Sequence, residues 1–319
     1  MTTITGASVP VGQNRRMTGI STARRADAET RTLPVYQAGA AVMPFTITGM
    51  DELVARDTVW APHSHPTHEL LWNRAGASTA TIGPRTWTIT PSVGLWIPAG
   101  VLHSAAAPAG TWYRTAQVDS RSTSPLPAEP VAVEMTPLLT LLLERLVDHT
   151  LQARSRELTE QMVFDTLEPS AHALLVQRPT AELLRPIVTA LESHPGDDRS
   201  LTEWAARLGV SERTVTRAFR TETGLSFGAW QAAFRAQHAS VLLGSGVPVD
   251  EVAVRVGYRS ASAFGAAFRR TTGLTPGQFR PATSPATSPA TNPATSPLSG
   301  PGVNAPATPS LSDPRYPAS

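Results

Sequence analysis

One helical pattern occurs twice in this chain, first as LTEWAARLGVSERTVTRAFRTETGLSFGAW (201–230) and then as VDEVAVRVGYRSASAFGAAFRRTTGLTPGQF (249–279). The copies align at their apolar, turn and capping positions, so that Trp204 corresponds to Val252 and Phe219 to Phe268. Agreement at these positions predicts two copies of one supersecondary unit.

Each copy has the pattern of a helix–turn–helix. A short helix ends at Gly209 or Gly257, and a second helix begins at the N-cap Ser211 or Ser260. Further capping boxes are expected at Ser200 with Glu203 and at Thr275 with Gln278. In the first copy, the outer face of the second helix is formed by Arg213, Thr214, Thr216, Arg217 and Arg220. A recognition helix that enters a DNA major groove has this layout. A helical bundle with a solvated arginine face is the alternative, but two copies in register argue against it.

Residues 199–280 resemble the DNA-binding domain of the AraC/XylS family of bacterial transcription regulators, most clearly in the run GYRSASAFGAAFRRTTGLTPGQFR (257–280). The resemblance implies an all-α domain of two helix–turn–helix units joined by a long helix, at about 227–243, with double-stranded operator DNA as partner. On the family's pattern, Arg213, Thr216 and Arg217 reach base edges and Arg220 a phosphate. In the second unit the outer face has only small side chains. We therefore expect it to contribute phosphate contacts from Arg259, Arg269 and Arg270 and one short polar contact from Ser262.

Charge is distributed unevenly along the 319 residues. The whole chain carries a net charge of +2, whereas residues 199–280 contain eleven arginines and five acidic residues. This segment therefore carries +6 and the remainder −4, which favours a nucleic-acid partner. The chain has no cysteine, so disulfides and thiol chemistry are excluded.

The segment 34–130 predicts a small antiparallel β-barrel or β-sandwich, because its short apolar runs are separated by glycine and proline. Two of its stretches resemble the paired motifs of the cupin barrel: HSHPTHE (63–69) and GLWIPAGVLH (94–103). The resemblance implies a metal site made by His63, His65, Glu69 and His103. Residues two apart in a strand share a face, so His63 and His65 can both point inward, whereas His68 has the opposite parity and is left out.

Three imidazoles and a carboxylate suit a divalent transition metal: iron, manganese, nickel, zinc or copper. The alternative is a hydrogen-bonded polar pocket without metal, since many regulators of this architecture bind an organic effector in the barrel.

The remaining segments complete an α+β chain. Residues 131–196 are expected to be a helical linking region, with helices beginning at Pro137 and at about 155 and 185. In the resembling family such helices often form a homodimer; ordinary packing against the barrel is the alternative, and the sequence does not decide between them. Residues 197–281 form the predicted DNA-binding domain. Residues 1–33 and the Pro/Ala/Thr/Ser-rich tail 282–319 are predicted to be disordered.

These observations predict a sequence-specific transcription regulator whose barrel senses a metal ion or a small molecule. The rival class is a cupin metal-dependent enzyme, such as a dioxygenase, with a DNA-binding appendage; no second group of acid, base or substrate-clamping residues accompanies the four ligands. Whether it is an activator, with RNA polymerase as a further partner, or a repressor is not encoded in the chain. Neither a membrane span nor a secretory signal is found, so we expect a cytoplasmic protein.

Overall fold

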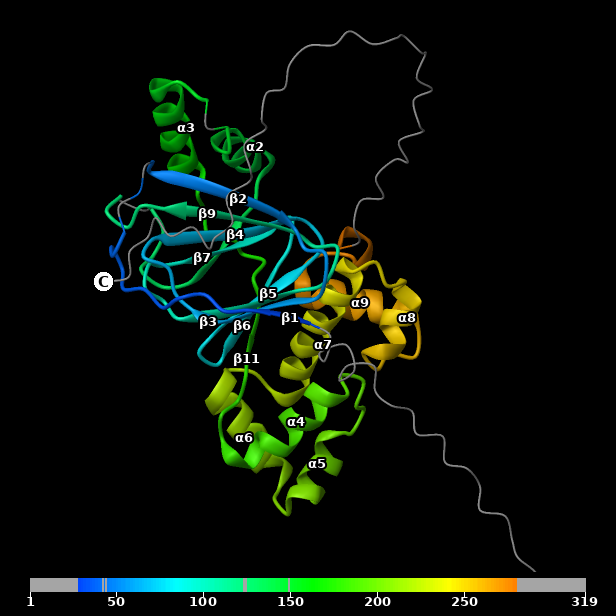
Figure 1. Ribbon diagram of the computed structural model, residues 1–319. Coiled ribbons are helices and arrows are strands. Elements are labelled where there is room, and N and C mark those ends of the chain that lie inside the picture. The colour runs from blue at the N-terminus through cyan, green and yellow to red at the C-terminus, as the bar shows by residue number, and fades with distance from the viewer. Residues whose placement is uncertain (1–27, 42, 44, 123–124, 149, 280–319) are drawn as a thin grey trace, which may run out of the picture.

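The computed structural model describes residues 28–279 except 42, 44, 123–124 and 149 (Figure 1). The predictions for residues 1–27 and for the tail 282–319 lie outside the described residues. Within the predicted disordered segment 1–33, residues Glu29–Arg31 form strand β1, which is a correction. This strand pairs in parallel with β3 (Thr58–His63), and Arg31 forms an ion pair with Glu52 that anchors it.

Two sheets packed face to face form the β-domain, so the expected α+β fold is confirmed. The six-stranded sheet has the order β1-β3-β8-β5-β6-β11, and the five-stranded sheet has the order β10-β7-β4-β9-β2. The strands not yet given are β2 (Ile47–Leu53), β4 (His68–Ala75), β5 (Ser78–Ile82), β6 (Arg85–Ile89), β7 (Val93–Ile97), β8 (His103–Ala107), β9 (Trp112–Val118), β10 (Val131–Glu134) and β11 (Leu174–Gln177). Alternate residues of the two sheets, such as Leu71, Ile89 and Leu95, fill the space between them.

Two of these strands lie in the region 131–196, which the sequence predicted to be helical. Strand β10 pairs antiparallel with β7, and β11 pairs antiparallel with β6. The β-domain therefore extends to Gln177 rather than ending at residue 130. Each of the two strands has four residues, which is too short for a period of two to be recognised in the sequence.

The expected helices of this region are present as α2 (Pro137–Leu146) and α3 (Ala153–Thr166). They cover the outer face of the five-stranded sheet, on the side away from the other helices (Figure 1). Leu139, Leu143 and Leu146 of α2 are buried there against Trp72 and Trp96. The apolar stripe of α2 is thus used for packing within the chain.

The remaining helices make up the two helix–turn–helix units. They are η1 (Glu182–Leu184), α4 (Arg185–Ser193), α5 (Leu201–Leu208), α6 (Glu212–Thr223), α7 (Phe227–Gly244), α8 (Val249–Arg255), α9 (Ala261–Thr272) and η2 (Pro276–Phe279). Helix α5 has the predicted capping box of Ser200 and Glu203 and ends at Gly209, which has φ 68°. The DNA-binding domain begins earlier than residue 197, because Leu184 and Ile187 are fully buried in the core of the first unit.

Helix α7 joins the two units and also contacts the β-domain. Phe227 and Trp230 lie in the core of the first unit, and Ala239 and Leu243 in that of the second. At its C-terminal end, a Cβ added at Gly244 would lie 2.5 Å from the backbone nitrogen of Ala77, between β4 and β5. Only glycine therefore allows the helix to approach the sheet this closely.

Replacing Gly244 by alanine is expected to lower the free energy of unfolding, although alanine favours helix by about 1 kcal/mol. Overpacking against a backbone atom costs about 1–3 kcal/mol, and this cost outweighs the helix preference. Gly228→Ala in the same helix is the matched control, because an added Cβ there meets nothing within 4 Å. Urea denaturation of the full chain measures both; equal stabilisation by the two substitutions would show that α7 does not press against the β-domain.

Candidate functional site

Helix α6 presents an arginine face to solvent. Its N-cap Ser211 accepts a hydrogen bond from the backbone N–H of Thr214, and Val215 and Phe219 are fully buried against the first-unit core. This burial leaves Arg213, Arg217 and Arg220 exposed. Within the described residues none of these three forms an ion pair, whereas neighbouring arginines such as Arg199 and Arg255 do. The face therefore carries uncompensated positive charge.

Of the two threonines predicted on this face, Thr216 is partly exposed beside the arginines. The hydroxyl of Thr214 lies 2.9 Å from that of Ser211, so it takes part in the helix cap. Arg207, in the last turn of α5, was not predicted; it is exposed and without an ion pair in the described part of the chain. The first helix of such a unit crosses the DNA backbone, which is the signal that would have singled it out.

Helix α9 offers a different surface. Ser260 is its N-cap, and Phe264 and Phe268 are buried. Arg259 and Ser262 are exposed at its N-terminal end, while Arg269 and Arg270 are exposed in its last turn. The two pairs are thus separated by about 12 Å along the helix, at 1.5 Å per residue. Between them the exposed side chains are small, as the sequence indicated.

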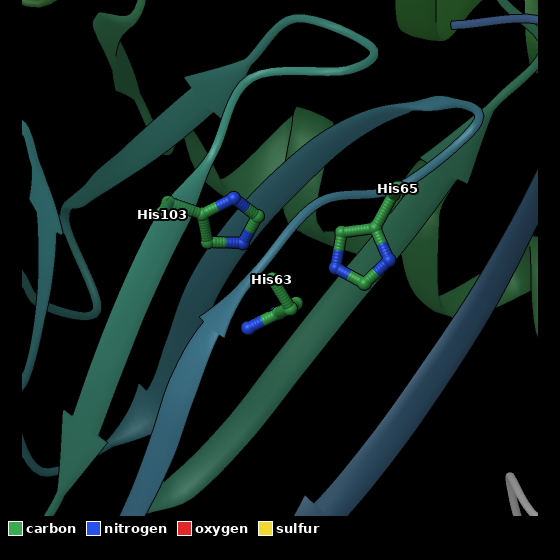
Figure 2. Close-up of side chains that lie close together, drawn as sticks. All are labelled: His63, His65 and His103. Carbon is green, nitrogen blue, oxygen red and sulfur yellow. The ribbon is translucent and has the colours of Figure 1, made fainter. Parts of the chain in front are cut away.

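Inside the β-domain, three histidines come together at one end of the six-stranded sheet (Figure 2). His63 is the last residue of β3, His103 is the first of β8, and the two are paired across the strands. His65 lies in the turn after β3. One ring nitrogen from each residue can be chosen so that all lie within 4.8 Å of one another. The residues predicted as imidazole ligands therefore converge.

The position of His65 in the cluster is not set by the strand alternation that the sequence predicted. Strand β3 ends at His63, with an irregular register between Trp60 and His63, so the two histidines do not share a strand face. The turn 64–67 brings His65 back to the cluster instead. Its position depends on contacts that the alternation of a strand does not contain, such as the hydrogen bond from Gly100 N–H to the carbonyl of His65.

Glu69, the predicted carboxylate ligand, points into the same space from β4. Its Oε2 lies 3.3 Å from His103 Nε2 and 3.6 Å from His65 Nε2. This oxygen is buried and has no hydrogen-bond partner within the described structure. The other oxygen, Oε1, accepts a hydrogen bond of 3.0 Å from Gln117 Nε2. Gln117 was not predicted, because only the pairing of β4 with β9 places it opposite Glu69.

Backbone carbonyls orient two of the imidazoles. Nδ1–H of His63 donates to the carbonyl of Ala61 at 2.7 Å, and Nδ1–H of His103 donates to that of Val101 at 2.9 Å. A carbonyl only accepts, so both rings carry the Nδ1 proton and present an unprotonated Nε2 when neutral. This arrangement is typical of imidazoles that bind a metal through Nε2.

Burial and mutual proximity shift the pKa values of the cluster. Burial lowers the pKa of His63 to about 4 and also lowers the pKa of His65. Burial acts in the same direction on His103, but the adjacent Glu69 carboxylate outweighs it and raises the pKa of His103. Burial opposes the charge of Glu69, yet the surrounding imidazoles hold the pKa of Glu69 below its usual value. These shifts favour neutral His63 and His65 beside an ionised Glu69, whereas the Glu69 carboxylate favours the charged form of His103.

His68 stays outside the cluster, as its parity predicted. Its ring stacks on Trp96 with centroids 5.0 Å apart, and its Nδ1 accepts a hydrogen bond from the N–H of Ala99 at 3.1 Å. This histidine is used in packing and is a suitable control residue.

Comparison with known proteins assigns both halves of the chain. Residues 52–203 match the AraC-like ligand binding domain, and residues 204–282 match a helix-turn-helix domain. The chain belongs to the AraC family of transcription regulators. It is therefore a DNA-binding regulator with an N-terminal effector-binding domain, which confirms the function predicted from the two motifs.

Among its relatives, the HTH-type transcriptional regulator NimR of Escherichia coli is 29% identical over 238 residues, covering 72% of this chain and 84% of NimR. The HTH-type transcriptional regulator RipA of Corynebacterium glutamicum is 39% identical over 121 residues, which cover 36% of this chain and 37% of RipA. The DNA-binding domain of the transcriptional factor AdpA, solved in complex with a target DNA, is 36% identical; the match covers 31% of this chain and 91% of that domain, with a TM-score of 0.30. Across the described residues, no helix is long and apolar enough to span a membrane.

Arg217→Ala is expected to weaken binding to a selected operator by about 1–3 kcal/mol and to relax sequence preference, because arginine can bond two acceptors of guanine. Ala266→Ser, at the small outer face of α9, should leave binding nearly unchanged. The probe is a duplex that the full-length protein selects from a random library, and binding is measured by fluorescence anisotropy at fixed salt. Equal losses from both substitutions would contradict the unequal division of base reading between the two helices.

Proposed function

We propose that the β-domain of this regulator senses a divalent transition metal ion held by His63, His65, Glu69 and His103. The observation that carries the proposal is the buried Oε2 of Glu69, which accepts no hydrogen bond from the described residues and lies beside converging imidazoles. A buried carboxylate oxygen without a partner is costly, and a cation beside it would remove that cost.

The donor set fits such an ion. Imidazole nitrogens with one carboxylate suit iron, manganese, nickel, zinc or copper. In His63 and His103 the Nδ1 proton is donated to a backbone carbonyl, so Nε2 of each neutral ring is the atom that can bind the ion. The ion would supply a positive charge that draws β3, β4 and β8 together. Gln117 would keep the carboxylate of Glu69 in place through its other oxygen.

Other occupants of the β-domain give different outcomes. An organic effector or a metal-free polar pocket would leave the four residues as a hydrogen-bonding group. A dioxygenase-like enzyme would use the same ligands for catalysis, since ligands alone do not separate sensing from turnover. The relatives are transcription regulators, which favours sensing. Oxygen consumption by metal-loaded protein would establish the enzymatic alternative.

Protein purified without chelator is expected to contain about one metal ion per chain, measured by elemental analysis. His63→Ala and His65→Ala should each lower metal affinity at least about tenfold and remove the effect of metal on operator binding. His68→Ala is the matched control, because it removes a neighbouring imidazole that points elsewhere. If His63→Ala and His65→Ala retained normal regulation, the organic-effector alternative would replace the metal sensor.

The proposed regulator acts in the cytoplasm as a homodimer, with RNA polymerase as a further partner if it is an activator. Support for the dimer comes from the outer face of α2 and α3, where Leu138, Leu141, Leu158 and Met162 are exposed, Leu141 to 63%. On α3, Arg154 and Asp165 lie exposed at opposite ends. Two antiparallel copies of α3 would therefore bring opposite charges together around an apolar centre.

Leu158→Asp combined with Met162→Asp is expected to convert the dimer to a monomer, because it places four charges in the apolar centre. Sedimentation velocity across a concentration series measures the change. Val254→Asp on α8, another exposed apolar residue, serves as the control and should leave the association unchanged. A full chain that sediments as a monomer at all concentrations would exclude this dimer.

A further inference from the structure

Strand β11 contributes side chains to three hydrophobic cores. Its four residues are Leu174, Leu175, Val176 and Gln177, and they pair with β6 at the edge of the six-stranded sheet. Successive side chains of a strand point to opposite faces. Leu175 accordingly packs with the core between the two sheets, while Leu174 and Val176 face outward towards α7.

The two outward residues enter different helix–turn–helix units. Val176 is buried in the first-unit core with Trp204 of α5 and Phe219 of α6. Leu174 is buried in the second-unit core with Phe264 and Phe268, which hold α9. Residues two apart on one strand of the β-domain are thus packed beneath both recognition helices.

Polar contacts fasten α7 to the same edge of the sheet. Trp230 Nε1–H donates to the carbonyl of Gln177 at 2.8 Å. Gln237, which is 7% exposed, donates through Nε2 to Thr86 O at 3.0 Å and to Thr88 Oγ1 at 3.2 Å. Both threonines belong to β6, where they pair with Val176 and Leu174. The joining helix is therefore held in register along β6 and β11.

The C-terminal end of α6 is tied to the chain just beyond β11. The Glu222 carboxylate accepts hydrogen bonds from Thr180 N–H at 2.9 Å, from the Thr180 hydroxyl at 2.8 Å and from Ala181 N–H at 3.2 Å. Gln177 also donates its side-chain amide to the carbonyl of Glu222. Contacts of this kind restrict both the tilt and the position of α6 relative to the sheet.

The geometry points to β11 as a positioning element for DNA recognition: Leu174 and Val176, residues of the β-domain, set the separation and tilt of α6 and α9. Two units that read one side of a duplex must match its helical repeat of about 34 Å. A duplex with one base pair more or less between the contacted grooves moves and rotates one subsite relative to the other. The proposal rests on the DNA-binding activity of the family and does not require a metal in the β-domain.

The rival explanation is that α7 alone sets the separation, because it too lies in both cores. In that case residues of β11 would act only on stability. The two explanations differ in one measurable quantity, the discrimination between operators of different spacing. Overall affinity does not separate them, since any loss of stability lowers it.

The test uses the full-length chain and a duplex that it selects from a random library, together with the same duplex carrying one base pair inserted or removed between its two subsites. The wild-type protein is expected to bind the altered duplexes about tenfold more weakly. Val176→Ala and Leu174→Ala should reduce this discrimination to less than about threefold, or move the preference to an altered spacing. Leu175→Ala, in the same strand but facing the β-domain core, should keep the wild-type discrimination.

The folded state of each variant is checked by circular dichroism. If the alanine variants do not fold, Gln237→Met takes their place, because it removes both hydrogen bonds to β6 while lying outside the two helix–turn–helix cores. It too should lower the discrimination between spacings. Folded variants that bind every duplex more weakly by one common factor, with the wild-type discrimination kept, would overturn the proposal.

Discussion

The burial of α7 is the constraint on which the rest of the molecule depends. Ten of its eighteen residues are buried, and they point towards the first unit, the second unit and the β-domain in turn. A helix buried on several sides has no solvated face wide enough to give an amphipathic pattern. Both recognition helices are held through the cores that α7 shares, so the direction of each arginine on α6 follows from this packing.

The two sites handle charge in opposite ways. On α6 the arginines are exposed and form no ion pair with the described residues, so their charge is available to a phosphate backbone, and its effect will fall as the salt concentration rises. In the β-domain, Glu69 is buried among imidazoles, where salt has little access and a missing partner is costly. An exposed positive surface suits an extended polyanion, and a closed group of donors suits a small cation.

Local chemistry in the sequence was sufficient to predict the helix–turn–helix units and their caps, whereas the convergence of His63, His65 and His103 was implied by the resemblance to the cupin motifs. A cap such as Ser200 with Glu203 depends on four consecutive residues, and both of its hydrogen bonds are present. The roles of Gln117 and β11 could not be predicted, because each depends on pairing with a distant strand. The same holds for α4, whose packing against Trp204 places it in the first unit rather than in a linking region. Sequence motifs therefore located the candidate ligands and the recognition helices, while long-range pairing decided which residues support them.

The side chains of β11 alternate between the β-domain core and the helix–turn–helix cores, so the register of this strand against β6 matters more for packing than the identity of its apolar residues. If the strand were shifted by one position against β6, every side chain would change face. Leu175 would then point towards the helices, while Leu174 and Val176 would leave the helix–turn–helix cores for the interior of the β-domain. One apolar residue of β11 can therefore be exchanged for another at small cost, whereas a shift of the strand by one position would remove Leu174 and Val176 from both helix–turn–helix cores.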